Sequence, residues 1–139
     1  MADFYSILNG TAALTAGGAA ASGWTAAVIT ANTAFDGLDH GRADRMLRKV
    51  ISATAGFQAA LLAIAAGATL ITGARVAAIV CGLCALGFLS NIWTLAPRRE
   101  KAPPGMRKKN TAQRVVAVSL TLIMTITALS GGILAAFGI

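Results

Sequence analysis

With 139 residues, 56% of them hydrophobic and a mean hydropathy of +0.70, the chain has room for one domain and the composition of a protein that folds in lipid. A water-soluble protein of this size needs charged side chains all over its surface, but here only 12% of the residues are charged and they cluster, which excludes a soluble globule. The formal net charge is +7, and because no aromatic residues are interleaved with the cations, a nucleic-acid partner is excluded as well.

Four apolar stretches with almost no charged residues follow one another, each with the ~20 residues that a helix needs to cross a hydrocarbon core of ~30 Å. The first is rich in Ala, Gly and Thr, and because Asp3 is its only early charge it lacks the basic start of a signal peptide. Little more than Thr72 and Gly73 separates the second from the third, which predicts a tight helical hairpin. The predicted spans are 5–33, 50–71, 74–95 and 115–139.

Two charged loops connect the spans, one at 36–49 and one at 97–114, and they contain 11 of the 12 Lys and Arg residues. The remaining cation, Arg75, lies in the opposite hairpin. The positive-inside rule therefore places both loops in the cytoplasm and both termini outside, in the periplasm. The predicted fold is an all-α integral membrane protein, a single four-transmembrane-helix bundle. The Ala- and Gly-rich composition and the compact loops point to a bacterial inner membrane.

The loops contain local signals of their own. In the first loop the acidic residues precede the basic ones and Asp44 pairs with Arg48 at i,i+4, so the segment is predicted to extend the second helix. In the second loop, Pro97 ends a helix and Asn110 offers an N-cap for the next. Cations beside the spans are predicted to contact anionic lipid headgroups, and those singled out are Arg98, Arg99, Arg107, Lys108 and Lys109.

Small residues are expected to hold the bundle together, because lipid supplies no hydrophobic drive between helices. Those predicted to face another helix, in the bundle or in another subunit, are Gly18, Ser22, Gly23, Gly82 and Gly131. Gln58 lies about two turns inside the second span, where an unpaired amide is costly. It is predicted either to hydrogen-bond to another helix or to contact a ligand or partner. Asn91 and Trp93, near the end of the third span, are close enough to reach the interface, although Trp93 fits helix packing equally well.

The middle of each span lacks ionisable residues, which argues against a proton-coupled antiporter and a rotary-ring subunit, since both need a carboxylate there. No histidine lies in a span, so haem or chlorophyll held through histidine is not expected. The one histidine, His40, lies among three Asp and four cations in the first loop, which is a poor metal site. The sequence thus predicts no cofactor and no metal.

One chemical motif is present in a span, the CxxC formed by Cys81 and Cys84, whose side chains share a helix face. With four helices around it, the arrangement is similar in outline to the quinone-coupled thiol oxidases of the disulfide-bond and vitamin K epoxide reductase families. The resemblance covers these four residues and the architecture, and implies a thiol-disulfide oxidoreductase with Arg75 near a quinone head. Those families have a second cysteine pair, which this chain lacks. The alternative reading is two small packing residues.

Three functional hypotheses follow. The short loops, small-residue faces and missing chemistry favour a non-enzymatic accessory or assembly subunit of a larger membrane protein complex. The CxxC motif supports the alternative, a membrane thiol-disulfide oxidoreductase. A small-solute channel or carrier is a third hypothesis, with no particular residue behind it. The expected partners are membrane lipids and other membrane protein subunits.

Overall fold

The computed structural model describes the backbone of residues 2–94 and 107–139, and the side chains of 3–39, 41–93 and 115–139. Every element in these ranges is helical. In chain order the elements are α1 (Ala2–Trp24), a π-helical segment η1 (Thr25–Ile29), α2 (Thr30–Gly37), α3 (His40–Thr72), α4 (Arg75–Thr94) and α5 (Arg107–Phe137).

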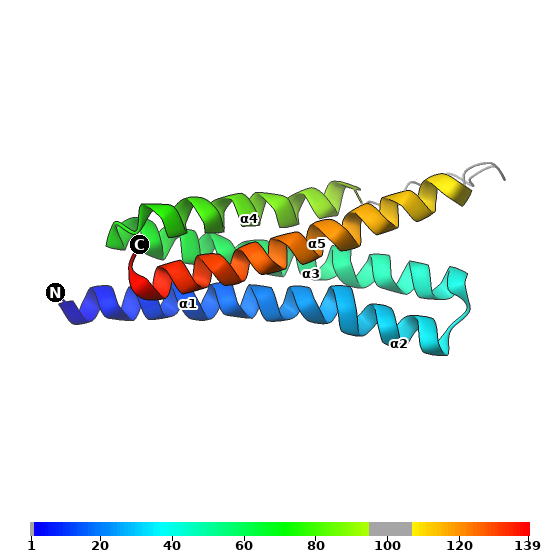
Figure 1. Cartoon of the computed structure of the whole chain (residues 1–139), viewed down its shortest axis with the longest axis horizontal. Helices are drawn as coiled ribbons and strands as arrows, with labels where there is room; N and C mark the ends of the chain where they lie inside the picture. The colour runs from blue at the N-terminus through cyan, green and yellow to red at the C-terminus, as the bar shows by residue number, and fades with distance from the viewer. Residues whose placement is uncertain (1, 95–106) are drawn as a thin grey trace.

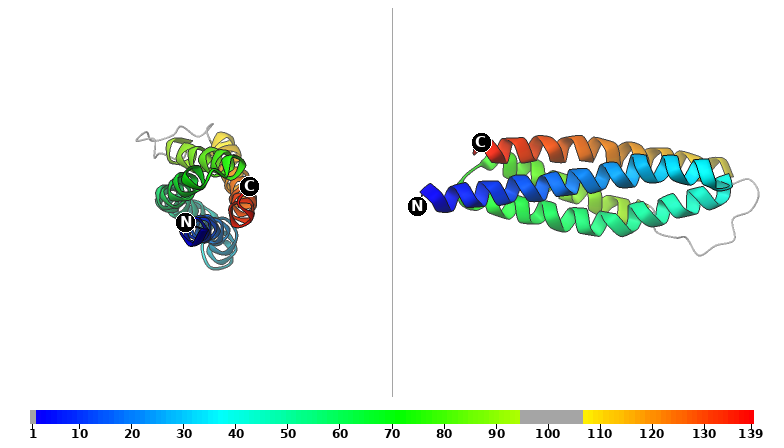
Figure 2. Two further views of the ribbon diagram at one scale, coloured as in Figure 1. Left: turned by 90° about the vertical axis from the view of Figure 1, so that its left-hand side faces the viewer. Right: turned by 90° about the horizontal axis from the view of Figure 1, so that it is seen from below.

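Four long rods pack side by side as a bundle, since α1, η1 and α2 form one continuous helix (Figure 1). The closest neighbours are α1 with α3, α3 with α4, α4 with α5, and α5 with α1, so the rods form a closed ring. The end-on view in Figure 2 shows this ring, and both termini lie at the same end of the bundle. Within the described residues four helices are long and apolar enough to cross a membrane: Asp3–Gly37, Gly41–Thr72, Arg75–Trp93 and Val115–Phe137. The expectation of an all-helical chain with four potential spans is therefore confirmed.

The predicted hairpin between the second and third spans is present. Gly73 adopts a left-handed conformation with φ of 82° and ends α3. The Ala74 N–H donates to the Thr69 carbonyl at 2.9 Å, which satisfies a carbonyl that the end of the helix would otherwise leave open. Only glycine takes this backbone conformation without strain, so the turn is encoded locally.

Both predicted loops, 36–49 and 97–114, overlap helices in the structure. Between α2 and α3 only Leu38 and Asp39 are non-helical, because the Asp39 carbonyl accepts hydrogen bonds from the N–H groups of Arg42 and Ala43 and so starts a new helix at once. The expected extension of the second helix is thus confirmed, while most of 36–49 is not a loop. The predicted N-cap at Asn110 is wrong, since α5 already begins at Arg107.

Among the described residues most buried hydrophobic positions are alanines, and most of the large apolar side chains point away from the bundle. Ala12 and Ala16 are 0% exposed, whereas Leu14 between them is 79% exposed. Trp93 is 87% exposed, so its packing inside this bundle is ruled out. This distribution is the reverse of that in a soluble helical protein, where large aliphatic side chains fill the core.

The first rod contains a π-helical turn that the sequence did not indicate. The Thr25 carbonyl accepts the backbone N–H of Thr30, five residues on, and also its hydroxyl at 3.1 Å. The extra residue in this turn rotates the part of the helix that follows, so it changes which face of α2 meets the bundle. Ala26, within the turn, belongs to a second small core cluster with Leu47, Ile51 and Ala117.

Candidate functional site

The cysteine pair lies in the centre of the bundle. Cys81 and Cys84 are both reduced and 0% exposed. The Cys84 thiol donates to the Met124 carbonyl of α5 at 3.7 Å, and Cys81 packs against Gly131 of the same helix. Thiol chemistry requires a thiolate that a partner can reach. Both sulfurs are buried and out of a partner's reach, so their geometry fits packing against α5 better than redox exchange.

The predicted packing glycines divide into close contacts and open positions. A Cβ at Gly131 would lie 2.9 Å from the Cys81 Sγ and 3.2 Å from Val80 Cγ1, so α4 and α5 approach closely here. A Cβ at Gly23 would collide with the Thr125 hydroxyl. At either position an added side chain would force a neighbouring side chain to shift.

The other small residues of the prediction contribute less. A Cβ at Gly18 would make an ordinary contact of 3.6 Å with Leu61, and the Ser22 hydroxyl donates to the Ala19 carbonyl of its own helix. A Cβ added at Gly82 would meet no heavy atom within 4 Å, so the predicted close packing of Gly82 against another helix is not found within the bundle. Two tight positions were missed: Gly87 lies against Met124, and Gly132 lies against Ala16.

A buried polar layer crosses the bundle on the side of the α2–α3 turn. Asn91 of α4 is 0% exposed and donates through Nδ2 to the Thr121 hydroxyl of α5 at 2.9 Å. The Thr121 hydroxyl donates in turn to the Ala117 carbonyl at 2.7 Å, and Thr125 donates to the Thr121 carbonyl at 2.7 Å. The sequence placed Asn91 near the interface, but its side chain turns inward instead. The threonines gave no signal in the sequence, because a hydroxyl bonded to its own helix looks the same on either face.

Gln58 of α3 is also buried, with 1% of its surface exposed. Because a Cβ on Gly56 would lie 4.0 Å from Ile92 Cδ1, Gln58 is within about one turn of the height of Asn91. Its amide nitrogen Nε2 has no hydrogen-bond partner among the described residues, so the predicted interhelical bond from this group is not observed. A buried amide without a partner costs about 1–3 kcal/mol.

Replacing Gln58 with Leu is therefore expected to raise the free energy of unfolding by about 1 kcal/mol, since the substitution removes an unsatisfied donor and conserves volume. Thr121→Val, which takes the acceptor from Asn91, is expected to lower it by about 1–3 kcal/mol. Both values come from denaturant titration of the detergent-solubilised protein followed by circular dichroism. A loss of stability in Gln58→Leu would contradict an unpaired buried amide at this position.

An apolar groove opens outward along the seam between α1 and α5. Its lining is mainly of small residues, with two larger side chains from α5: Ala13, Gly17, Leu129, Gly132, Ile133 and Ala136. Ala13 with Gly17, and Gly132 with Ala136, have the i,i+4 spacing of small residues in helix contacts. Gly17 has no heavy atom within 4 Å of an added Cβ, so the groove is empty above it.

The cations predicted to contact headgroups are only partly described. Arg98 and Arg99 lie outside the described residues. Arg107, Lys108 and Lys109 form the first turn of α5, and their side chains lie outside the described ones. Among the described residues, no three His, Cys, Asp or Glu side chains gather as a metal site would require.

Comparison with protein-family models, with curated proteins and with solved structures finds no match.

Proposed function

We propose that this protein is a non-enzymatic accessory or assembly subunit that crosses the bacterial inner membrane four times and docks a partner's transmembrane helix in the groove between α1 and α5. Both termini face the periplasm and the two basic connections face the cytoplasm, as the distribution of Lys and Arg favours. The basic connections contact anionic headgroups, with Arg98, Arg99, Arg107, Lys108 and Lys109 as the contacting cations.

The arrangement of side chains supports insertion in lipid. Large apolar residues such as Leu14, Phe57 and Ile79 are more than half exposed on different helices, and water would penalise each of them. Lipid does not, because its chains are as apolar as these side chains. The alanine core then gives close helix contacts, which provide the van der Waals attraction that stabilises membrane bundles.

The groove is the observation that carries the docking proposal. Apart from Leu129 and Ile133 the groove is lined by small residues, and its floor lies where the half-buried Gly17 of α1 meets the buried Gly132 of α5. An added Cβ at Gly132 would lie 3.3 Å from the Ala16 Cβ, so α1 and α5 are already in close contact beneath the groove. A partner helix seated here gains close packing against both helices at once.

Filling the groove tests this proposal. We expect Gly17→Leu to reduce the amount of partner that co-purifies with a tagged copy from native membranes by at least about tenfold, because the leucine occupies the partner's place. Gly67→Leu is the matched control, since Gly67 of α3 also has no heavy atom within 4 Å of an added Cβ and is exposed on another face. Quantitative mass spectrometry of the purified material in mild detergent measures the ratio.

Equal partner recovery from both variants would overturn the docking site, and a wild-type protein that purifies alone would overturn the subunit role. The oxidoreductase alternative gains nothing from the structure, because both sulfurs are shielded by α5. No observation favours a channel or carrier.

A further inference from the structure

The first turns of α3 form a basic surface that the proposed docking role does not use. A groove on this surface is lined by Arg42, Arg45, Met46, Lys49 and Val50. Gly41–Thr72 contains 32 residues and is about 48 Å long, which is more than the ~30 Å of a hydrocarbon core. The charged turns before Val50 therefore extend into the headgroup region when the apolar part of α3 spans the core.

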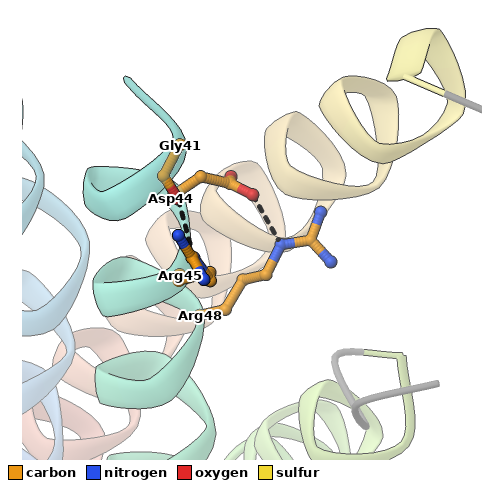
Figure 3. Close-up of polar contacts among 4 residues, drawn as sticks. All are labelled: Gly41, Asp44, Arg45 and Arg48. Carbon is orange, nitrogen blue, oxygen red and sulfur yellow. Dashed lines mark hydrogen bonds and ion pairs between the residues drawn. The ribbon is translucent and has the colours of Figure 1, made fainter. Parts of the chain in front are cut away.

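The acid and base pair of this segment lies outside the groove. Asp44 and Arg48 form an ion pair, with Arg48 Nε 3.1 Å from Asp44 Oδ2 (Figure 3). Arg45 donates through Nε to the Gly41 carbonyl at 3.2 Å, which orients the guanidinium and leaves its two terminal nitrogens without a described partner. The ion pair found among the described side chains thus joins Asp44 to Arg48 and includes none of the cations that line the groove.

The three groove cations are exposed and have no acidic partner among the described side chains. Arg42, Arg45 and Lys49 have the i, i+3, i+7 spacing that places them on one helix face, over about 10 Å along the axis. Met46 and Val50 lie beside this face, and Met46 is 44% exposed. The groove therefore combines a row of positive charge, without an acidic partner among the described side chains, with an apolar edge at the end of a potential span.

We propose that this groove binds a single anionic phospholipid, with the headgroup phosphate held by Arg42, Arg45 and Lys49 and an acyl chain along Met46 and Val50. The positive charge and the apolar edge together favour a lipid over an acidic protein segment, because a lipid has both an anionic headgroup and an acyl chain that can cover the exposed Met46. The inference rests on the membrane insertion in the proposed function but not on partner docking, so loss of lipid binding and loss of the partner are separate outcomes.

Lipid binding to the purified full-length protein in a non-ionic detergent tests the site. Native mass spectrometry counts bound lipid during titration with phosphatidylglycerol or phosphatidylcholine. We expect the wild-type protein to bind phosphatidylglycerol in preference to phosphatidylcholine. Arg45→Gln should weaken the affinity for phosphatidylglycerol about fivefold, because each interfacial cation contributes about 1 kcal/mol. The triple variant R42Q/R45Q/K49Q should weaken this affinity roughly a hundredfold. Arg75→Gln, which removes one cation at the opposite end of the bundle, is the matched control and is expected to change nothing.

Three outcomes would overturn the assignment. Equal weakening by Arg45→Gln and Arg75→Gln would mean a general charge effect, and equal binding of phosphatidylcholine would mean that the anionic headgroup is not read. Displacement of the lipid by the same concentration of inorganic phosphate would assign the groove to a free anion. Circular dichroism of the triple variant shows whether the fold is kept, and Arg45→Gln alone keeps the test decisive if it is not.

Discussion

Replacing Phe88 with Ala is expected to destabilise the bundle by about 3 kcal/mol, the largest loss we expect from a single substitution. Phe88 is the largest fully buried side chain, and its ring lies 3.5 Å from the Cβ position of Gly23. Its neighbours in the core are mainly alanines, which cannot extend to fill the space. A buried Phe→Ala change costs about 3–5 kcal/mol in soluble proteins. For the membrane-embedded bundle that we propose, the transfer contribution falls away and the cavity contribution remains, so the lower end of this range is expected.

The adjacent residue provides the control for this prediction. Leu89 is 44% exposed, and Leu89→Ala is expected to cost less than about 1 kcal/mol because it leaves no internal cavity. Reversible unfolding in mixed detergent micelles, followed by circular dichroism, gives both values. Similar losses for the two variants would contradict the burial of this face of α4.

The second large effect is expected at Gly131. Gly131→Val places a side chain against Cys81 and Val80 at the closest approach of α4 and α5, and overpacking of this kind costs about 1–3 kcal/mol. Gly82→Val is the matched control, since Gly82 meets nothing within 4 Å and its variant should be near neutral. From the sequence, both glycines were predicted to face another helix. Unfolding titrations of both variants distinguish them.

A double variant identifies the cause of the loss at Gly131. Gly131→Ala alone still brings a Cβ to 2.9 Å from the Cys81 Sγ, and Cys81→Ala removes that sulfur. The combined variant should therefore lose less stability than the sum of the two single variants. Additive losses would mean that the helices do not meet at this pair.

Local features of the sequence were sufficient for the number and position of the helices. Runs of apolar residues marked the four potential spans, and Gly73 marked the hairpin through its left-handed conformation. The acid-before-base order indicated that 40–49 continues as helix, as α3 does. These signals act within a few residues of one another, so they need no knowledge of the tertiary structure.

The boundaries at the charged ends were less accurate. Asn110 has the chemistry of an N-cap, but the preceding basic residues are themselves good helix formers, and α5 begins at Arg107. The π-helical turn at Thr25 was not visible either. Alanine and threonine accommodate both helix types, and contacts of Ala26 with α3 and α5 accompany the observed turn.

Which face of each helix points inward was decided only by the tertiary structure. In water, hydropathy separates a buried face from an exposed one, but in lipid both faces are apolar and the signal vanishes. Nothing local distinguishes Gly131, pressed against Cys81, from Gly82, which is open, or tells that Asn91 turns inward to Thr121. Sequence alone determined that this chain makes four apolar helices with basic connections. Helix pairing determined the buried polar layer, the shielded cysteines and the groove, because these depend on how closely two backbones approach.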